Sequence, residues 1–141
     1  MSRRVGEMRQ MRVLLADDQA KVRSALRLVL EQQPDLEVLG EAVDTTGLLD
    51  WVKATCPDLV LLDWELPGLK ADGLLPTLRK LCPCLAVIAL SGRPEARRAA
   101  LGAGVDAFVS KGDLPERLLA AVNDCCHRQH NNEFRMERTT E

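Results

Sequence analysis

Three aspartates directly follow apolar runs and could together hold a cation. Asp63 ends the run Val60-Leu61-Leu62, and Asp17 and Asp18 follow the run Val13-Leu14-Leu15-Ala16. If both runs are parallel strands of one sheet, the three carboxylates meet at the same edge of that sheet. Carboxylates so close together repel one another and demand a counter-ion. We therefore expect a cation-dependent site at this edge.

Two further polar residues end later apolar runs. Ser91 follows Leu85 to Leu90, and Lys111 follows Val105 to Val109. Mg²⁺ suits a few carboxylates together with waters and a phosphate. A carboxylate nucleophile, a metal ion, a hydroxyl and an ammonium group are the parts that phosphoryl transfer needs. Each residue also has an ordinary explanation, as a helix cap, a turn or a solvated charge, and only their joint placement favours the chemical one.

The elements that would position these residues alternate regularly along the chain. Apolar runs predict five strands, at 11–16, 36–43, 59–62, 85–90 and 105–109. Between and after them, apolar residues at helical spacing predict five helices, with Thr45 or Thr46 as one cap and Pro94 in a first turn. The predicted inner faces include Ala25, Leu81, Ala99 and Leu114. Such alternation predicts an α/β fold, a parallel sheet covered by helices on both faces.

Composition limits the class of protein. The 141 residues suffice for one domain, and 46% apolar but only 3% aromatic residues predict an aliphatic core. The net charge of −2, mixed along the chain, gives no basic face for nucleic acid. No apolar stretch reaches the roughly 20 residues that span a membrane, and no signal peptide is recognisable, so we expect a cytoplasmic protein. We divide the chain into a polar extension (1–10), one domain (11–126) and a polar tail (127–141).

Five cysteines are present, an odd number without the spacing of a disulfide framework. Reduced thiols are therefore the expected state. The spacings Cys82-Pro83-Cys84 and Cys125-Cys126 also differ from the two-residue knuckle of zinc sites, so we expect no structural metal there.

The motifs at the strand ends resemble the receiver domains of two-component response regulators, over about residues 11 to 125. They are listed here: Ala16-Asp17-Asp18, Leu62-Asp63 with Leu66-Pro67-Gly68, Ser91-Gly92, and Phe108-Val109-Ser110-Lys111. The stretches 34–42 and 103–108 are most similar to receivers of the NarL/LuxR type. The resemblance implies a flavodoxin-like receiver fold, a five-stranded parallel sheet of order 2-1-3-4-5 with five flanking helices.

The resemblance also implies roles at the site. Asp63 would accept a phosphoryl group from a histidine kinase, and Lys111 would pair with a phosphate oxygen. Asp18 would bind Mg²⁺ directly and Asp17 mainly through water, with Asp63 and the backbone carbonyl of Glu65 as further ligands. The protein would thus not be a conventional enzyme, but would catalyse its own aspartyl phosphorylation and dephosphorylation.

Switching would involve Ser91 and Phe108. Ser91 would turn toward the new phosphate and Phe108 would swing into the space vacated, which moves the face formed by the fourth helix, fifth strand and fifth helix. The aromatic residue is Phe rather than Tyr, so it carries no hydroxyl. We also hypothesise that Glu65 and Arg93 pair across the site and tune phosphate hydrolysis, and that Trp64 packs in or near the core.

The expected partners are a histidine kinase or phosphotransfer protein, with a homodimer as a further possibility and no direct nucleic-acid or membrane contact. Two architectures stay open. The chain is either a single-domain regulator or the receiver part of a longer NarL/LuxR-type transcription factor.

Three rival classes fit the sequence less well. A haloacid-dehalogenase-like phosphatase carries Asp-x-Asp after its first strand, whereas Asp63 follows the third. A flavodoxin-like cofactor carrier needs a phosphate loop that Asp17 and Asp18 would repel. A receiver-like protein that is not phosphorylated would not need the full set of acidic, serine and lysine residues.

Overall fold

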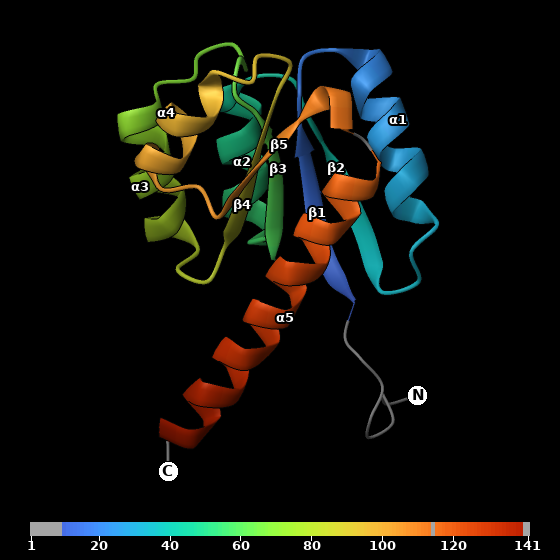
Figure 1. Ribbon diagram of the computed structural model, residues 1–141. Coiled ribbons are helices and arrows are strands. Elements are labelled where there is room, and N and C mark those ends of the chain that lie inside the picture. Colours follow the sequence, from blue (N-terminus) through green and yellow to red (C-terminus); the bar gives the residue numbers. More distant parts are fainter. Residues whose placement is uncertain (1–9, 114, 140–141) are drawn as a thin grey trace.

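The fold is a five-stranded parallel sheet between two layers of helices (Figure 1). The computed structural model describes residues 10–113 and 115–139, with side chains at 10–70, 73–113 and 115–128. The strands are β1 (Met11–Ala16), β2 (Leu36–Ala42), β3 (Leu59–Asp63), β4 (Ala86–Ser91) and β5 (Ala107–Ser110). The helices are α1 (Ala20–Glu31), α2 (Thr45–Thr55), α3 (Ala71–Leu81), α4 (Ala96–Ala103), the short η1 (Lys111–Asp113) and α5 (Glu116–Thr139). The strand order β2-β1-β3-β4-β5 confirms the predicted fold.

The register of the sheet brings the ends of the strands to one edge. Ala16 at the end of β1 pairs with Leu62, one residue before the end of β3. Asp63 pairs with Leu90, and Ser91 pairs with Ser110 at the end of β5. The residues that follow β1, β3, β4 and β5 therefore start from one edge, as parallel pairing requires.

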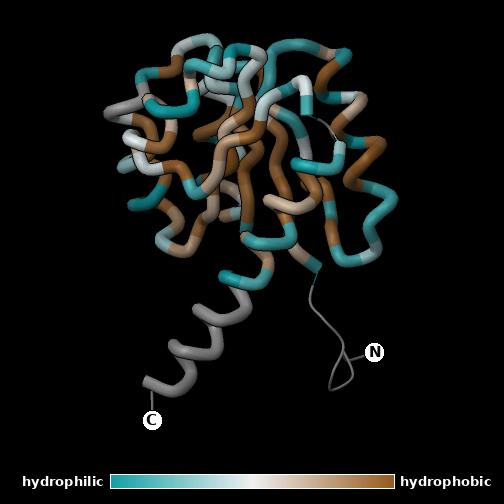
Figure 2. Tube along the Cα trace, viewed as in Figure 1, coloured by the Kyte–Doolittle hydropathy of each residue, from teal (hydrophilic) through white to brown (hydrophobic). Residues whose placement is uncertain are grey.

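The sheet is buried on both faces because its side chains alternate between two cores. Leu59 and Leu61 of β3 pack in a cluster with α1 and α5, whereas Val60 and Leu62 pack in a second cluster with α2, α3 and α4. Figure 2 shows the central strands as a hydrophobic layer, with polar residues mainly on the outer loops and helices. Truncating one such buried leucine to alanine typically costs about 2–5 kcal/mol. This two-sided packing gives the site a rigid base.

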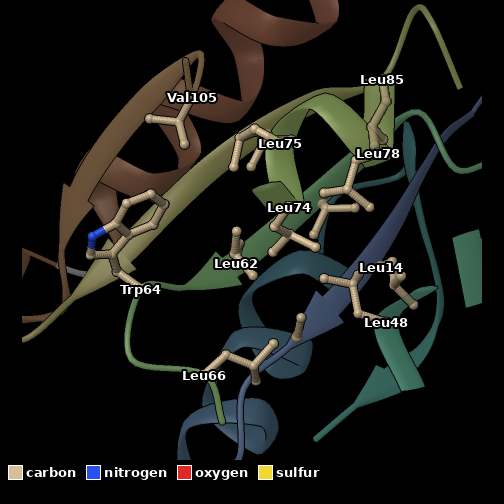
Figure 3. Packing of buried hydrophobic residues seen from close by; sticks show 14 of the residues in the cluster. Leu14, Leu48, Leu62, Trp64, Leu66, Leu74, Leu75, Leu78, Leu85 and Val105 are labelled. Atoms are coloured by element: carbon tan, nitrogen blue, oxygen red, sulfur yellow. The ribbon is translucent and has the colours of Figure 1, made fainter. Parts of the chain in front are cut away.

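Trp64 lies in the second cluster, as predicted. It is 9% exposed and packs in the cluster that includes Leu62, Leu66 and Val105 (Figure 3). The backbone N–H of Trp64 donates to the carbonyl of Leu90 at 2.8 Å, which extends the β3–β4 pairing one residue beyond Asp63. The turn after β3 is thus anchored to the core.

Several local predictions were wrong. The cap of α2 is Asp44, not Thr45 or Thr46, because the Asp44 carboxylate accepts the N–H of Gly47 at 2.8 Å. The fifth strand begins at Ala107 rather than Val105, and at the preceding residue the carboxylate of Asp106, instead of a backbone carbonyl, accepts the N–H of Val87 and also binds the guanidinium of Arg79. Strand β2 ends at Ala42 rather than at residue 43. Helix α4 starts at Ala96, so Pro94 precedes the helix and does not lie in its first turn.

The buried faces predicted for three helices are also wider than the faces that the structure buries. Ala25, Leu81 and Ala99 are exposed, because each helix meets the sheet along a narrower stripe than its apolar residues cover. Leu114 lies outside the described residues. The polar segment after residue 126 continues α5 as far as Thr139, and Figure 1 shows this helix reaching past the sheet. The domain boundaries themselves stay a prediction.

Two of the five cysteines form a disulfide, whereas the sequence predicted reduced thiols. Cys56, at the end of α2, and Cys82, at the end of α3, form a disulfide with their Cα atoms 5.7 Å apart. Their pairing is spatial, since 26 residues separate them, and no sequence spacing indicates it. None of the described helices is both long and apolar enough to cross a membrane.

Candidate functional site

Asp17 is held at the end of β1 by three hydrogen bonds. Its N–H donates to the carbonyl of Ala42 at 3.0 Å, one residue past the β1–β2 ladder. Its Oδ1 accepts the N–H of Gln19 at 2.8 Å, and its carbonyl accepts Nη1 of Arg23 at 2.8 Å. Arg23 in turn donates to Glu41 at 2.7 Å, so β2 and α1 together hold the acidic loop. The Asp17 carboxylate is consequently buried and held in place by the backbone around it.

Asp63 is held in a similar way at the end of β3. Its Oδ1 accepts the N–H of Glu65 at 3.0 Å, and its carbonyl accepts the N–H of Leu66 at 3.0 Å. These bonds form a tight turn in which the carboxylate binds the backbone two residues on. Asp63 is only 2% exposed, so this strand end presents a nearly buried carboxylate.

The three aspartates converge as the strand pattern indicated. One carboxylate oxygen from each of Asp17, Asp18 and Asp63 lies within 4.8 Å of the others. Lys111 reaches into the same group, with Nζ 2.9 Å from Asp17 Oδ2 and 3.4 Å from Asp63 Oδ1. Two of the three carboxylates thus contact one ammonium group, and the cluster keeps a net negative charge.

The protonation equilibria reflect this crowding. Burial raises the pKa of Asp63, and the nearby charge of Asp17 adds to the effect, although the Glu65 N–H and Lys111 act in the opposite direction. Burial by itself would lower the pKa of Lys111, but the contact with Asp17 and the charges of both aspartates outweigh it and raise that pKa. The site therefore holds its ammonium firmly and still lacks positive charge.

The residues present fit a hard divalent cation. Asp17 Oδ2 is buried, and the ammonium group of Lys111, 2.9 Å away, is its one partner among the described residues, so this oxygen keeps lone-pair capacity for a cation. Carboxylate oxygens from Asp17, Asp18 and Asp63 are the ligand type that Mg²⁺ prefers, and Asp18 is exposed, which leaves room for waters. The carbonyl of Glu65 stays a predicted ligand.

Ser91 lies at the end of β4 with its hydroxyl already engaged. The side chain is fully buried, and Oγ donates to the Glu65 carboxylate at 2.9 and 3.1 Å. Oγ also accepts the N–H of Arg93 at 3.0 Å. Arg93 Nη2 lies 3.4 Å from Glu65 Oε2, so the ion pair predicted between these two residues forms.

Phe108 lies on the edge strand β5, next to Ala89 in the register. It is partly buried and packs against the cluster that contains Trp64. Its role as the switch residue stays a prediction.

The buried polar side chains single out this edge of the sheet. Among the residues whose side chains the structure describes, those of Asp17, Asp63 and Ser91 are the buried polar or charged ones. All three were predicted from the strand ends. The contact between Glu65 and Ser91 was missed, although the sequence contains a signal for it: Glu65 and Arg93 each lie two residues after a strand end.

Comparisons with known proteins agree with this geometry. The sequence pattern of the response regulator receiver domain matches residues 13–123. A protein-glutamate methylesterase/protein-glutamine glutaminase of Ralstonia nicotianae is 40% identical over 118 residues, which are 80% of this chain and 30% of that protein. The nitrate/nitrite response regulator protein NarL of Escherichia coli is 32% identical over 113 residues, which are 79% of this chain and 52% of NarL.

Solved structures of receiver domains also resemble this fold. A CheY-like response regulator receiver domain protein of Methanospirillum hungatei superimposes with a TM-score of 0.76 at 26% identity, covering 87% of this chain and 98% of that one. The chain spans about a third to a half of the length of these two curated relatives.

Proposed function

The chain belongs to the response regulator receiver domain family, and on that premise we propose that Asp63 accepts a phosphoryl group in a Mg²⁺-dependent reaction. One observation carries the proposal. The buried carboxylates of Asp17 and Asp63 contact Lys111 at the carboxyl edge of the sheet where the buried Ser91 also ends its strand, and the like charges of this cluster would only destabilise a fold that made no use of them.

The donor is a phosphohistidine on a histidine kinase or phosphotransfer protein. A carboxylate oxygen of Asp63 attacks the phosphorus atom, the phosphorus–nitrogen bond breaks, and an acyl phosphate forms. Lys111, 3.4 Å from Asp63, is placed to pair with a phosphate oxygen. Asp17, Asp18, Asp63 and the Glu65 carbonyl would hold Mg²⁺, which supplies charge neutralisation to the transferring group. Attack by water on the same phosphorus reverses the modification.

The modified domain switches between two conformations. Ser91 donates its hydroxyl to the phosphate, and Phe108 moves inward beside β4, which changes the surface of α4, β5 and α5. The Glu65–Arg93 pair lies at this edge of the sheet and sets the rate at which the phosphate is hydrolysed. Timing dephosphorylation of the E65A and R93A variants tests this last point, and unchanged lifetimes in both would disprove it.

The output of the switch is an altered protein surface rather than a conventional enzymatic product. The changed face of α4, β5 and α5 would bind a partner or a second copy of the chain, in the cytoplasm. The chain matches about half of NarL, so a role as the receiver part of a transcription factor and a role as a single-domain regulator remain two forms of the proposal. A search for a downstream helix-turn-helix distinguishes them.

Intact-mass spectrometry tests the phosphoacceptor. After incubation with acetyl phosphate and Mg²⁺, the wild type should gain the mass of one phosphoryl group. D63N should gain none, and neither should the wild type in excess chelator. The variant D50N, which changes an exposed aspartate on α2, serves as the matched control and should react like the wild type. Equal modification of D63N and D50N would refute the proposal.

A further inference from the structure

The hydroxyl of Ser91 is bound to a carboxylate other than Asp63. It donates to both oxygens of Glu65, at 2.9 and 3.1 Å, from a fully buried position. A hydroxyl has a single hydrogen to donate. While Glu65 holds that hydrogen, Ser91 has none left for a phosphoryl group on Asp63.

We propose that the Glu65 side chain is a latch that holds the switch hydroxyl of Ser91 and thereby opposes the phosphorylated conformation. The inference rests on the proposed phosphorylation of Asp63 and adds a positioning residue to it. Hydrogen bonds to a charged acceptor are stronger than neutral ones, so the latch favours the unphosphorylated state. Any gain from the bond between Ser91 and the phosphate is reduced by the bond lost to Glu65.

Arg93 weakens this latch by competing for the same carboxylate. Its Nη2 lies 3.4 Å from Glu65 Oε2, and its side chain is 61% exposed and free to follow the carboxylate. When Ser91 turns away, Glu65 keeps Arg93 as a partner and is not left unpaired. Removing Arg93 should therefore strengthen the hold of Glu65 on Ser91, whereas removing Glu65 abolishes it.

Glu65 could also act on the phosphate directly, through like-charge repulsion. The two effects differ in their dependence on Ser91. A latch acts only through the Ser91 hydroxyl, so its effect disappears in an S91A background. Charge repulsion persists whether or not the hydroxyl is present. A double-mutant cycle separates the two.

The measurement is the affinity for beryllofluoride, a phosphate mimic, by calorimetry at saturating Mg²⁺. We expect E65A to bind it about five- to tenfold more tightly than the wild type, the value of one charge-assisted bond at a partly exposed carboxylate. R93A should bind it about two- to threefold more weakly, as befits an exposed ion pair. In the S91A background, E65A should change the affinity by less than about twofold.

The control is E95A, which removes an exposed carboxylate from the neighbouring loop, the one that carries Arg93; Glu95 makes no side-chain capping bond to α4. It should bind like the wild type. Equal tightening by E65A with and without the Ser91 hydroxyl, or no tightening in either, would overturn the latch while leaving phosphorylation of Asp63 intact. Absence of binding by the wild type would instead overturn the proposed function, and the latch with it.

Discussion

Replacing Lys111 with alanine should destabilise the domain, and Mg²⁺ should restore part of the loss. Lys111 brings the ammonium group 2.9 Å from Asp17 and 3.4 Å from Asp63, two carboxylates that are almost fully buried. At an effective dielectric constant of about 20, charges separated by the longer of these distances attract by about 5 kcal/mol. Desolvation of the three groups offsets a large part of that attraction.

Removing one partner of a buried ion pair typically costs about 3–5 kcal/mol. Because Lys111 is 18% exposed and water reaches the cluster, we expect K111A to lose about 2–4 kcal/mol of unfolding free energy without divalent cations. For a domain of this size that lowers the melting temperature by about 8–15 °C. The carboxylates left without their ammonium should then bind Mg²⁺ about tenfold more tightly, worth about 1.4 kcal/mol at saturation.

Thermal unfolding with chelator and with saturating Mg²⁺ measures both effects. The matched control is K80A, which removes an exposed lysine near the end of α3. If K111A melts no lower than K80A, the ammonium does not support the cluster. If Mg²⁺ stabilises K111A and the wild type equally, the metal and Lys111 do not share the same carboxylates. Either result would refute this account of the site.

Three further predictions concern the scaffold. Reducing the Cys56–Cys82 disulfide should cost about 3.5 kcal/mol of unfolding free energy, the loop-closure entropy for a separation of 26 residues, and lower the melting temperature in reducing buffer. E41Q should cost about 1 kcal/mol at neutral pH, as two partly exposed arginine pairs are weakened. Those arginines hold the pKa of Glu41 below its usual 4.5, so this contribution is complete above that pH and is lost as the pH falls through the lowered value. G68A should destabilise the turn after β3 by about 1–3 kcal/mol, because Gly68 has φ 86° and its new Cβ would meet the hydroxyl of Thr45.

Each of these has a direct check. The C56S/C82S variant should have the melting temperature of the reduced wild type, and reductant should not change it. If reductant does not change the melting temperature of the wild type either, the prediction for the disulfide is contradicted. Equal stability of E41Q and the wild type at neutral pH would contradict the second. Equal denaturation midpoints for G68A and the wild type would contradict the third, with G73A as the control, since a Cβ at Gly73 meets no atom within 4 Å.

The sequence was most informative where strand ends carry polar residues. Uninterrupted apolar runs such as 59–62 identify strands buried on both faces, and parallel pairing then places Asp17, Asp63 and Ser91 at one edge. The regular alternation of strands and helices along the chain, together with the parallel direction of the strands, is enough to place the acidic cluster at this edge.

What the sequence could not supply are contacts between side chains of distant segments. The disulfide joins the ends of α2 and α3, whose proximity depends on how both helices pack on the sheet. The bond from Ser91 to Glu65 likewise depends on rotamers at two separate strand ends. Helix faces were overestimated at Ala25 and Leu81 because an apolar residue on a helix need not touch the core.

Locating the acceptor residue tests the central claim most directly. The protein is phosphorylated with a small-molecule donor and Mg²⁺, reduced with borohydride, which converts an aspartyl phosphate to homoserine, and digested for peptide mass spectrometry. The account predicts that homoserine replaces Asp63, and that no other aspartate is converted. Conversion at Asp17, at Asp18 or at no aspartate would contradict it.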